Sequence, residues 1–101
     1  MTVIEFNKAI NNIEGHTYHQ INGIIKICKK NWTNLNQEHR QIIEDKLKQC
    51  IRVAQHDIES CLDNNFFSRD LDSEKYVFTQ SKAVWKATCF IIQQLPLLYN
   101  H

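Results

Sequence analysis

Four cysteines are the side chains of this 101-residue chain best suited to metal or redox chemistry. They are far apart in the sequence and include no Cys-x-x-Cys pair, the spacing that is typical of zinc sites. Each one falls at an apolar position of a predicted helix, where a thiol behaves as a small hydrophobic side chain. We therefore predict reduced and mostly buried thiols, with no metal bound, at Cys28, Cys50, Cys61 and Cys89.

Histidine and glutamate pairs at helical spacing are the second candidate for metal chemistry. His16 and His19 are three residues apart, as are His56 and Glu59, so each pair lies on adjacent turns of a helix. A chain that folds back near residues 33–36 brings the second pair roughly opposite the first, and a metal site between helices is one alternative. His19 and His56, however, point away from the apolar faces of their own helices. We interpret the histidines as solvated surface side chains.

Nucleophilic catalysis has little support in this sequence. Serines and cysteines are present, but no Gly-x-Ser-x-Gly elbow and no glycine-rich phosphate loop surrounds them. The chain contains two glycines and one proline, which leaves few irregular segments from which a pocket is built. We therefore expect a protein that is not an enzyme and that holds no cofactor.

Basic residues gather in the middle of the chain and give the alternative of nucleic-acid binding. A basic helix face with an aromatic side chain can neutralise phosphates and stack on bases. Glu38, Glu44 and Asp45 interrupt this region, and the net charge of the whole chain is only +1, so we favour solvated helix faces. The basic region of this alternative consists of Lys26, Lys29, Lys30, Trp32, Arg40, Lys46, Lys48 and Arg52.

Apolar side chains recur every three or four residues along most of the chain, which is the period of an amphipathic α-helix. The first such stretch predicts a helix from about Val3 to Asn31. Thr2 and Glu5 at its start have the spacing of a capping box, in which the hydroxyl and the carboxylate each bind a backbone amide. Gly15 allows a kink or a break, since glycine costs a helix about 1 kcal/mol relative to alanine.

Two further helices follow the first. The second is predicted to begin after Asn36, its cap, and to end near residues 63–65. The third covers Ser73–Leu95 and stops before Pro96, which lacks an amide donor. The segment Phe66–Leu71 between them is rich in large apolar side chains. We expect this segment to cover one end of the helices.

Short connections between long helices favour antiparallel neighbours. The sequence therefore predicts one all-α domain over residues 1–101, an antiparallel up-down-up bundle of three long helices. The first residues lack the basic and apolar regions of a signal peptide, and no run approaches the roughly 18 apolar residues of a membrane span. We expect a cytoplasmic protein that does not insert into a membrane.

The predicted third helix is apolar on two faces, whereas a surface helix normally buries one. A broad face, which we assign to the core, carries Val77, Ser81, Val84, Trp85, Thr88, Cys89, Ile92 and Leu95. The opposite face is then the predicted association surface, where alanines let another helix approach and aromatics anchor it. Alternatively, this face is covered within the bundle. Its residues are Tyr76, Ala83, Ala87 and Phe90.

A helix with two apolar faces favours association over chemistry. We expect the chain to form a homodimer and to bind another protein stoichiometrically, as immunity proteins, antitoxins and small phage-encoded inhibitors do. Such proteins need an adhesive scaffold and no catalytic groups. The alternatives are a nucleic-acid-associated helical accessory subunit that uses the region from Lys26 to Arg52, and a metal-binding helical bundle.

Overall fold

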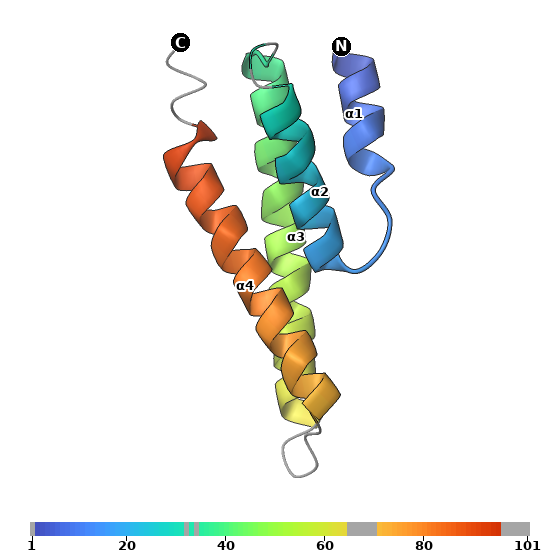
Figure 1. Ribbon diagram of the computed structural model, residues 1–101, viewed down its shortest axis with the longest axis vertical. Helices are drawn as coiled ribbons and strands as arrows, with labels where there is room; N and C mark the ends of the chain where they lie inside the picture. The colour runs from blue at the N-terminus through green and yellow to red at the C-terminus, as the bar shows by residue number, and fades with distance from the viewer. Residues whose placement is uncertain (1, 32, 34, 65–70, 96–101) are drawn as a thin grey trace.

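The computed structural model describes residues 2–31, 33, 35–64 and 71–95. Within these ranges the chain has no strand and forms four helices, which run alternately down and up the long axis (Figure 1). The prediction of an all-α chain is confirmed, but the bundle has a fourth helix that the sequence analysis did not separate. The helices are α1 (Val3–Asn11), α2 (Thr17–Lys30), α3 (Gln37–Asn64) and α4 (Leu71–Gln93).

Two predicted parts of the chain lie outside the described residues. The first is the apolar segment Phe66–Leu71, of which only Leu71 is described, as the first residue of α4. The second is the end of the chain from Pro96. The expectation that this segment covers one end of the helices therefore stays a prediction.

The first predicted helix is divided into α1 and α2 at the glycine that the sequence analysis named as a kink or break. Gly15 has a φ of 102°, which glycine adopts without the steric cost that a Cβ imposes. The side-chain amide of Gln20 donates to the Gly15 carbonyl at 3.1 Å and satisfies it. The chain reverses here, so α2 returns antiparallel to α1. This reversal creates the additional helix.

Gly23 has a different role, since it lies inside α2. A Cβ at this position would lie 3.0 Å from Cγ2 of Ile13, closer than ordinary van der Waals contact. The missing side chain therefore leaves room for Ile13, which is half-buried against the core. The glycine holds the segment between α1 and α2 close to the α2 backbone.

Replacing Gly15 by alanine is expected to lower the free energy of unfolding by about 1–2 kcal/mol. A Cβ would be strained at the positive φ and would lie 3.3 Å from Cδ2 of His19. Urea denaturation followed by circular dichroism measures the loss. Gly15→Asn is the matched control, because asparagine tolerates positive φ better and should lose less. Equal losses in the two variants would contradict the assigned backbone strain.

The starts of α1 and α3 form as their sequences predict, whereas α4 begins at Leu71 and not at Ser73. In α1 the Glu5 amide donates to the Thr2 hydroxyl at 3.1 Å, and the Thr2 amide donates to the Glu5 carboxylate, which completes the capping box. At the start of α3 the His39 amide donates to the Asn36 side-chain oxygen at 3.1 Å. The Asn36 amide in turn donates to Nδ1 of His39 at 3.1 Å. Asn36 is therefore the cap, and His39 is its reciprocal partner.

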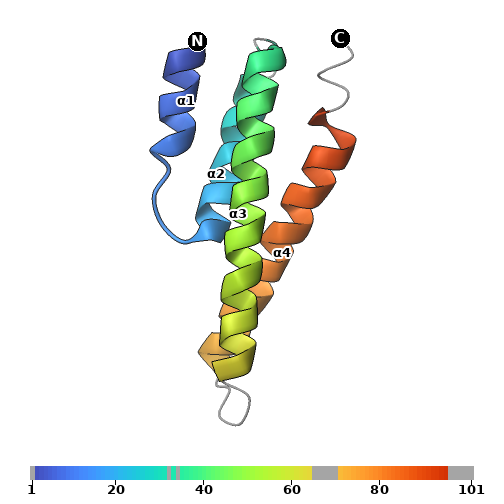
Figure 2. The same cartoon turned by 180° about the vertical axis from the view of Figure 1, so that it is seen from behind.

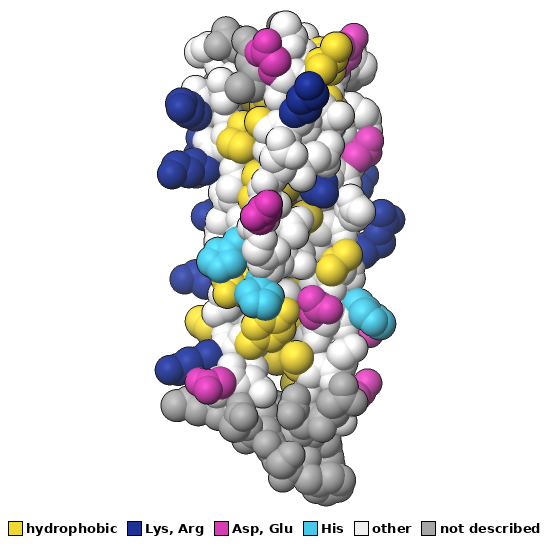
Figure 3. Space-filling model, turned by 90° about the vertical axis from the view of Figure 1, so that its right-hand side faces the viewer, with side chains coloured by type: hydrophobic (Ala, Val, Ile, Leu, Met, Phe, Trp, Pro, Cys, Tyr) yellow, Lys and Arg dark blue, Asp and Glu magenta, His cyan; other side chains and the backbone are white. Residues whose placement is uncertain are grey.

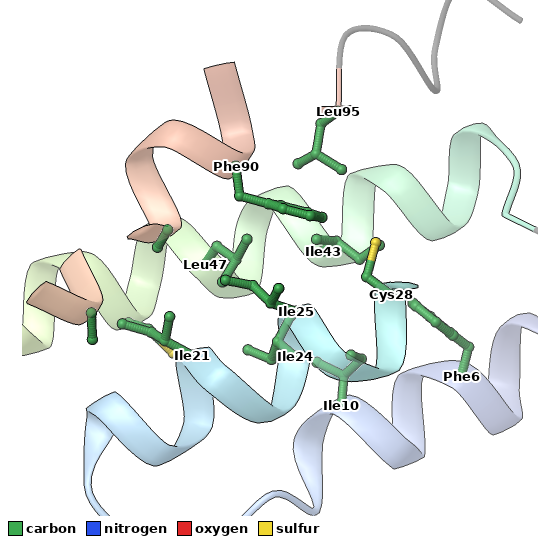
Figure 4. Close-up of a cluster of buried hydrophobic side chains, with 13 residues drawn as sticks. Phe6, Ile10, Ile21, Ile24, Ile25, Cys28, Ile43, Leu47, Phe90 and Leu95 are labelled. Atoms are coloured by element: carbon green, nitrogen blue, oxygen red, sulfur yellow. The ribbon is translucent and has the colours of Figure 1, made fainter. Parts of the chain in front are cut away.

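The core lies where α1 and α2 pack against α3 and the second half of α4 (Figure 4). Apolar side chains of the first two predicted helices supply most of it, which is what their periodic spacing predicts. Burial of each large aliphatic or aromatic side chain contributes about 1.5–3 kcal/mol. The buried residues labelled in the figure are Phe6, Ile10, Ile21, Ile24, Ile25, Cys28, Ile43, Leu47, Phe90 and Leu95.

The described part of the molecule is elongated, with principal extents of 50 × 25 × 17 Å. α3 and α4 extend past the start of α2, so these two helices alone form one end of the described structure (Figures 1 and 2). In this region α4 has α3 as its described neighbour and leaves a broad part of its surface uncovered. The long helix α4 is therefore both a core element and a surface element.

Candidate functional site: the outer face of α4

The face of α4 that the sequence analysis assigned to association points toward the core. Ala83, Ala87 and Phe90 are buried in the core cluster, and Tyr76 is half-buried. The assignment of the two faces is therefore wrong, except that Leu95 of the broad face is buried as predicted, and these residues are covered within the bundle, as the alternative interpretation has it. Alanine side chains let α4 approach α2 and α3 closely, which explains why the face with the smaller side chains is the internal one.

Three large apolar side chains stand exposed on the opposite face of α4. Phe78, Trp85 and Ile92 are 69%, 70% and 67% exposed. They follow one another at intervals of seven residues, almost two helical turns, so they line up along the helix. At a rise of about 1.5 Å per residue the row is roughly 21 Å long. We call Phe78, Trp85 and Ile92 the outer stripe.

The two flanks of the outer stripe differ in charge. On the α2 side lie exposed Lys75, Lys82 and Lys86, and Nζ of Lys86 donates to the side-chain oxygen of Asn22 at 3.3 Å. The other flank carries no charged side chain after Glu74. Its Thr88 hydroxyl donates to the carbonyl of Val84 at 2.8 Å, so the hydroxyl hydrogen has its partner within the helix. The residues of this flank are Val77, Ser81, Val84, Thr88 and Ile91.

The lysine flank borders a groove between α2 and α4. One hollow of about 400 Å³ is lined by Asn22, Phe78, Thr79, Lys82, Ala83 and Lys86. A second hollow of about 230 Å³ is lined by Ile25, Lys29, Lys86, Cys89, Phe90, Gln93 and Gln94. Since Lys86 lines both, we treat them together as the α2/α4 groove. Neither lining contains a carboxylate.

The alternative basic region does not form one surface. Lys26, Lys29 and Lys30 are exposed on α2, whereas Lys48 and Arg52 are exposed on the side of α3 opposite its buried residues. Arg40 is half-buried, with its guanidinium 3.7 Å from the Glu44 carboxylate, and Lys46 is half-buried as well. Trp32 lies outside the described residues. The structure thus separates the lysines of α2 from the basic residues of α3.

The histidines named in the sequence analysis are exposed, as predicted, and two of them belong to an aromatic cluster. The His16 ring stacks on Tyr18 at a centroid distance of 5.5 Å and meets Tyr76 edge-on at 5.5 Å. His19 lies beside Tyr18 at 4.3 Å. Histidines and apolar side chains are adjacent on this face in Figure 3. The rings of this cluster pack between the start of α2 and α4.

Metal binding has no donor set in the described part of the chain. No three of its His, Cys, Asp or Glu side chains gather in a way that could hold a metal ion. His56 and Glu59 are exposed on α3, apart from the aromatic cluster. The metal-binding bundle therefore gains no support from the geometry.

A part-buried polar network joins α3 to α4 beside the aromatic cluster, and the sequence analysis did not anticipate it. The Tyr76 hydroxyl donates to the Asp57 carboxylate at 3.4 Å, and the Gln80 amide donates to the Tyr76 oxygen at 3.1 Å. Burial, aided by the Asp57 charge, raises the pKa of the Tyr76 phenol. The phenol therefore stays neutral and holds the two helices in register. Three residues on two helices give no local sequence signal for such a network.

The cysteines are thiols, as predicted, but only two are fully buried. Cys28 and Cys50 lie in the core, while Cys61 and Cys89 are half-buried. Burial raises the pKa of the Cys28 thiol from 9.0 to about 12, against a smaller opposing effect of Lys29. Burial also raises the pKa of Cys50, with Lys46 opposing it. Neither core thiol is suited to act as a nucleophile at neutral pH, because the thiolate is the reactive form.

Raising the pH from 9 to 12 is expected to destabilise the protein through Cys28. The unfolded thiol releases its proton near pH 9.0 and the folded thiol near 12, so the unfolded state binds fewer protons in this window and the free energy of unfolding falls. Urea denaturation at pH 8 and 10.5 should show a loss in the wild type that exceeds the loss in Cys28→Ala by roughly 1–2 kcal/mol. Equal losses in both proteins would argue against the burial of this thiol.

No family model, curated protein or solved structure matches this chain. Among the helices described, none is both long enough and apolar enough to cross a membrane. The function is therefore inferred from the chain's own surface. On that surface the outer stripe and the α2/α4 groove together are the strongest candidate site.

Proposed function

We propose that the chain is a non-catalytic protein-binding module that associates stoichiometrically through the outer stripe of α4. The observation that carries this proposal is the exposure of Phe78, Trp85 and Ile92 in one row. Single exposed apolar side chains are common on soluble proteins, but aligned large ones mark interaction surfaces.

The side chains of the stripe suit a protein partner. Tryptophan is among the residues that contribute most to interface energies, and Trp85 lies at the centre of the row. A helix that packs on another helix needs apolar side chains at intervals of about seven residues, which the stripe supplies. The flank opposite the lysines adds small and apolar side chains, and a partner that covers them desolvates no charge there.

The class of protein we favour remains the one that the sequence suggested. Immunity proteins, antitoxins and small phage-encoded inhibitors act by covering a partner, and a helical scaffold with one adhesive face suffices for that task. A homodimer through the same face is the competing form of association. Both forms use the outer stripe, so one variant tests them together.

Trp85→Glu is the variant that tests the proposal. Tagged wild type and variant are expressed in the source cell, crosslinked and purified, and the bound proteins are quantified by mass spectrometry. We expect the wild type to retain one protein at an equimolar ratio in high salt and the variant to lose it, because a carboxylate replaces the central apolar anchor. Lys48→Glu, on the outer surface of α3, is the matched control and should retain the partner. An identical set of bound proteins in all three samples contradicts the proposal.

A further inference from the structure

We infer that the partner of the outer stripe is an amphipathic helix with acidic side chains along one edge, which packs along α4 with that edge over the lysines of the α2/α4 groove. This inference rests on the proposed function and specifies the chemistry of the partner. It follows from three features of the surface: the spacing of the stripe, the charge of its two flanks and the groove beside it.

The spacing of the stripe favours a helical partner. Phe78, Trp85 and Ile92 repeat every seven residues, the interval at which two packed helices meet. Ser81 and Thr88 lie between them on the same side and are small, so a second helix can approach the α4 backbone closely. A straight row of roughly 21 Å corresponds to about four turns of such a helix.

The charge around the groove favours an acidic partner. α2 contains no Asp or Glu, and α4 contains none after Glu74. Lys29, Lys82 and Lys86 line the two hollows without an acidic neighbour in either lining. A row of Lys and Arg side chains also runs along the left-hand edge of the molecule in Figure 3. Carboxylates placed over these lysines would gain both attraction and specificity.

The same charges disfavour a second copy of this chain. In an antiparallel pair of α4 helices each flank meets its own counterpart, so Lys75 and Lys82 would face the same lysines of the second copy. In a parallel pair the lysines would face the uncharged flank of Val77 and Val84. Neither arrangement supplies carboxylates, and an acidic helix from another protein does.

The groove gives the acidic helix a place for one apolar anchor. The hollow of about 400 Å³ lies beside Phe78 and is lined by the small side chain of Ala83, with Lys82 and Lys86 at its sides. A partner leucine or phenylalanine can enter there while adjacent glutamates reach the two lysines. This combination of apolar anchor and charged rim is typical of helix-in-groove recognition.

Two synthetic peptides test the inference. Each has three heptads with leucine at both core positions, and the flanking positions carry glutamate in one peptide and lysine in the other. Anisotropy of the labelled peptides at 0.15 M salt measures binding to the full chain. We expect the wild type to bind the glutamate peptide at least tenfold more tightly. Lys82→Glu with Lys86→Glu should reverse this preference.

The matched control replaces Lys48 and Arg52 by glutamate on the outer surface of α3. It changes the net charge by the same amount and should leave the preference unchanged. Equal affinity of the wild type for both peptides overturns the acidic partner, although the proposed function stands as long as Trp85→Glu still loses its bound protein. Absence of binding by either peptide also overturns the inference, and only the purification experiment decides the proposed function.

Two other occupants of the stripe are outcomes of the same set of measurements. A wild-type dimer in sedimentation equilibrium that Trp85→Glu dissociates assigns the stripe to a second copy and overturns the inference. A 20-nucleotide single-stranded DNA that binds more tightly than the glutamate peptide, with steep salt dependence and loss in Lys82→Glu, assigns the surface to nucleic acid and overturns it as well. A monomer that prefers the glutamate peptide over the DNA supports the inference.

Discussion

Replacing Ala87 by glutamate is expected to unfold the protein or to lower its free energy of unfolding by more than about 3 kcal/mol. Ala87 is fully buried on the face of α4 that contributes to the core cluster. A carboxylate placed there loses its hydration and has no space, so it must either be protonated or force the helix away from its neighbours. Urea denaturation followed by circular dichroism at 222 nm measures the effect.

Trp85→Glu is the matched control, because it places the same side chain two residues earlier on the opposite face of the same helix. Trp85 is 70% exposed, so its replacement should change the free energy of unfolding by only about 0.5 kcal/mol. Small and equal losses in the two variants would show that Ala87 is not internal. They would return the association surface to Tyr76, Ala83, Ala87 and Phe90.

The helical character of the chain was predictable because its determinants are local. The 3.6-residue period, the capping box of Thr2 and Glu5, and the cap at Asn36 each involve residues within a few positions of one another. The sequence also indicated a possible break at Gly15, because glycine destabilises a helix. Whether the chain bends or reverses there depends on Ile13 finding its place beside Gly23, which involves packing across the turn.

The orientation of α4 was not predictable from its own sequence. Both faces are apolar, and the sequence analysis assigned the broader one to the core. The structure buries the opposite face instead, since Ala83 and Ala87 allow a closer approach to α2 and α3 than Trp85 would. Which face of α4 is buried depends on the shape of the neighbouring helices, and the α4 sequence does not contain this information.

The candidate site depends on the same nonlocal information. Its lysines become a common feature only when α2 lies beside α4, as the contact between Asn22 and Lys86 shows across 64 positions of the chain. In the sequence these lysines fall into separate groups, and only those of α2 belong to the basic region between Lys26 and Arg52. The seven-residue interval of the stripe is visible in the sequence, but its exposure is not.

Replacing Phe6 by alanine is expected to cost about 3–5 kcal/mol of the free energy of unfolding. The Phe6 ring is fully buried and meets the His39 ring edge-on at a centroid distance of 4.7 Å. Its removal leaves a cavity against His39, the reciprocal partner of the α3 cap, whose Nδ1 accepts a hydrogen bond from the Asn36 amide. One truncation therefore weakens both the packing of α1 and the start of α3.

α1 is especially sensitive to this loss, because it has only nine residues and an isolated helix of that length is marginal in water. Phe6 and Ile10 are its buried residues, so without the ring it has one large anchor left. Ile4→Ala is the matched control, since Ile4 belongs to the same helix and is 71% exposed, and it should cost less than about 0.5 kcal/mol. Hydrogen exchange should show faster exchange of the α1 amides in Phe6→Ala alone. If both variants lose equally little stability, α1 does not contribute to the core, and the three helices α2, α3 and α4 form the stable unit.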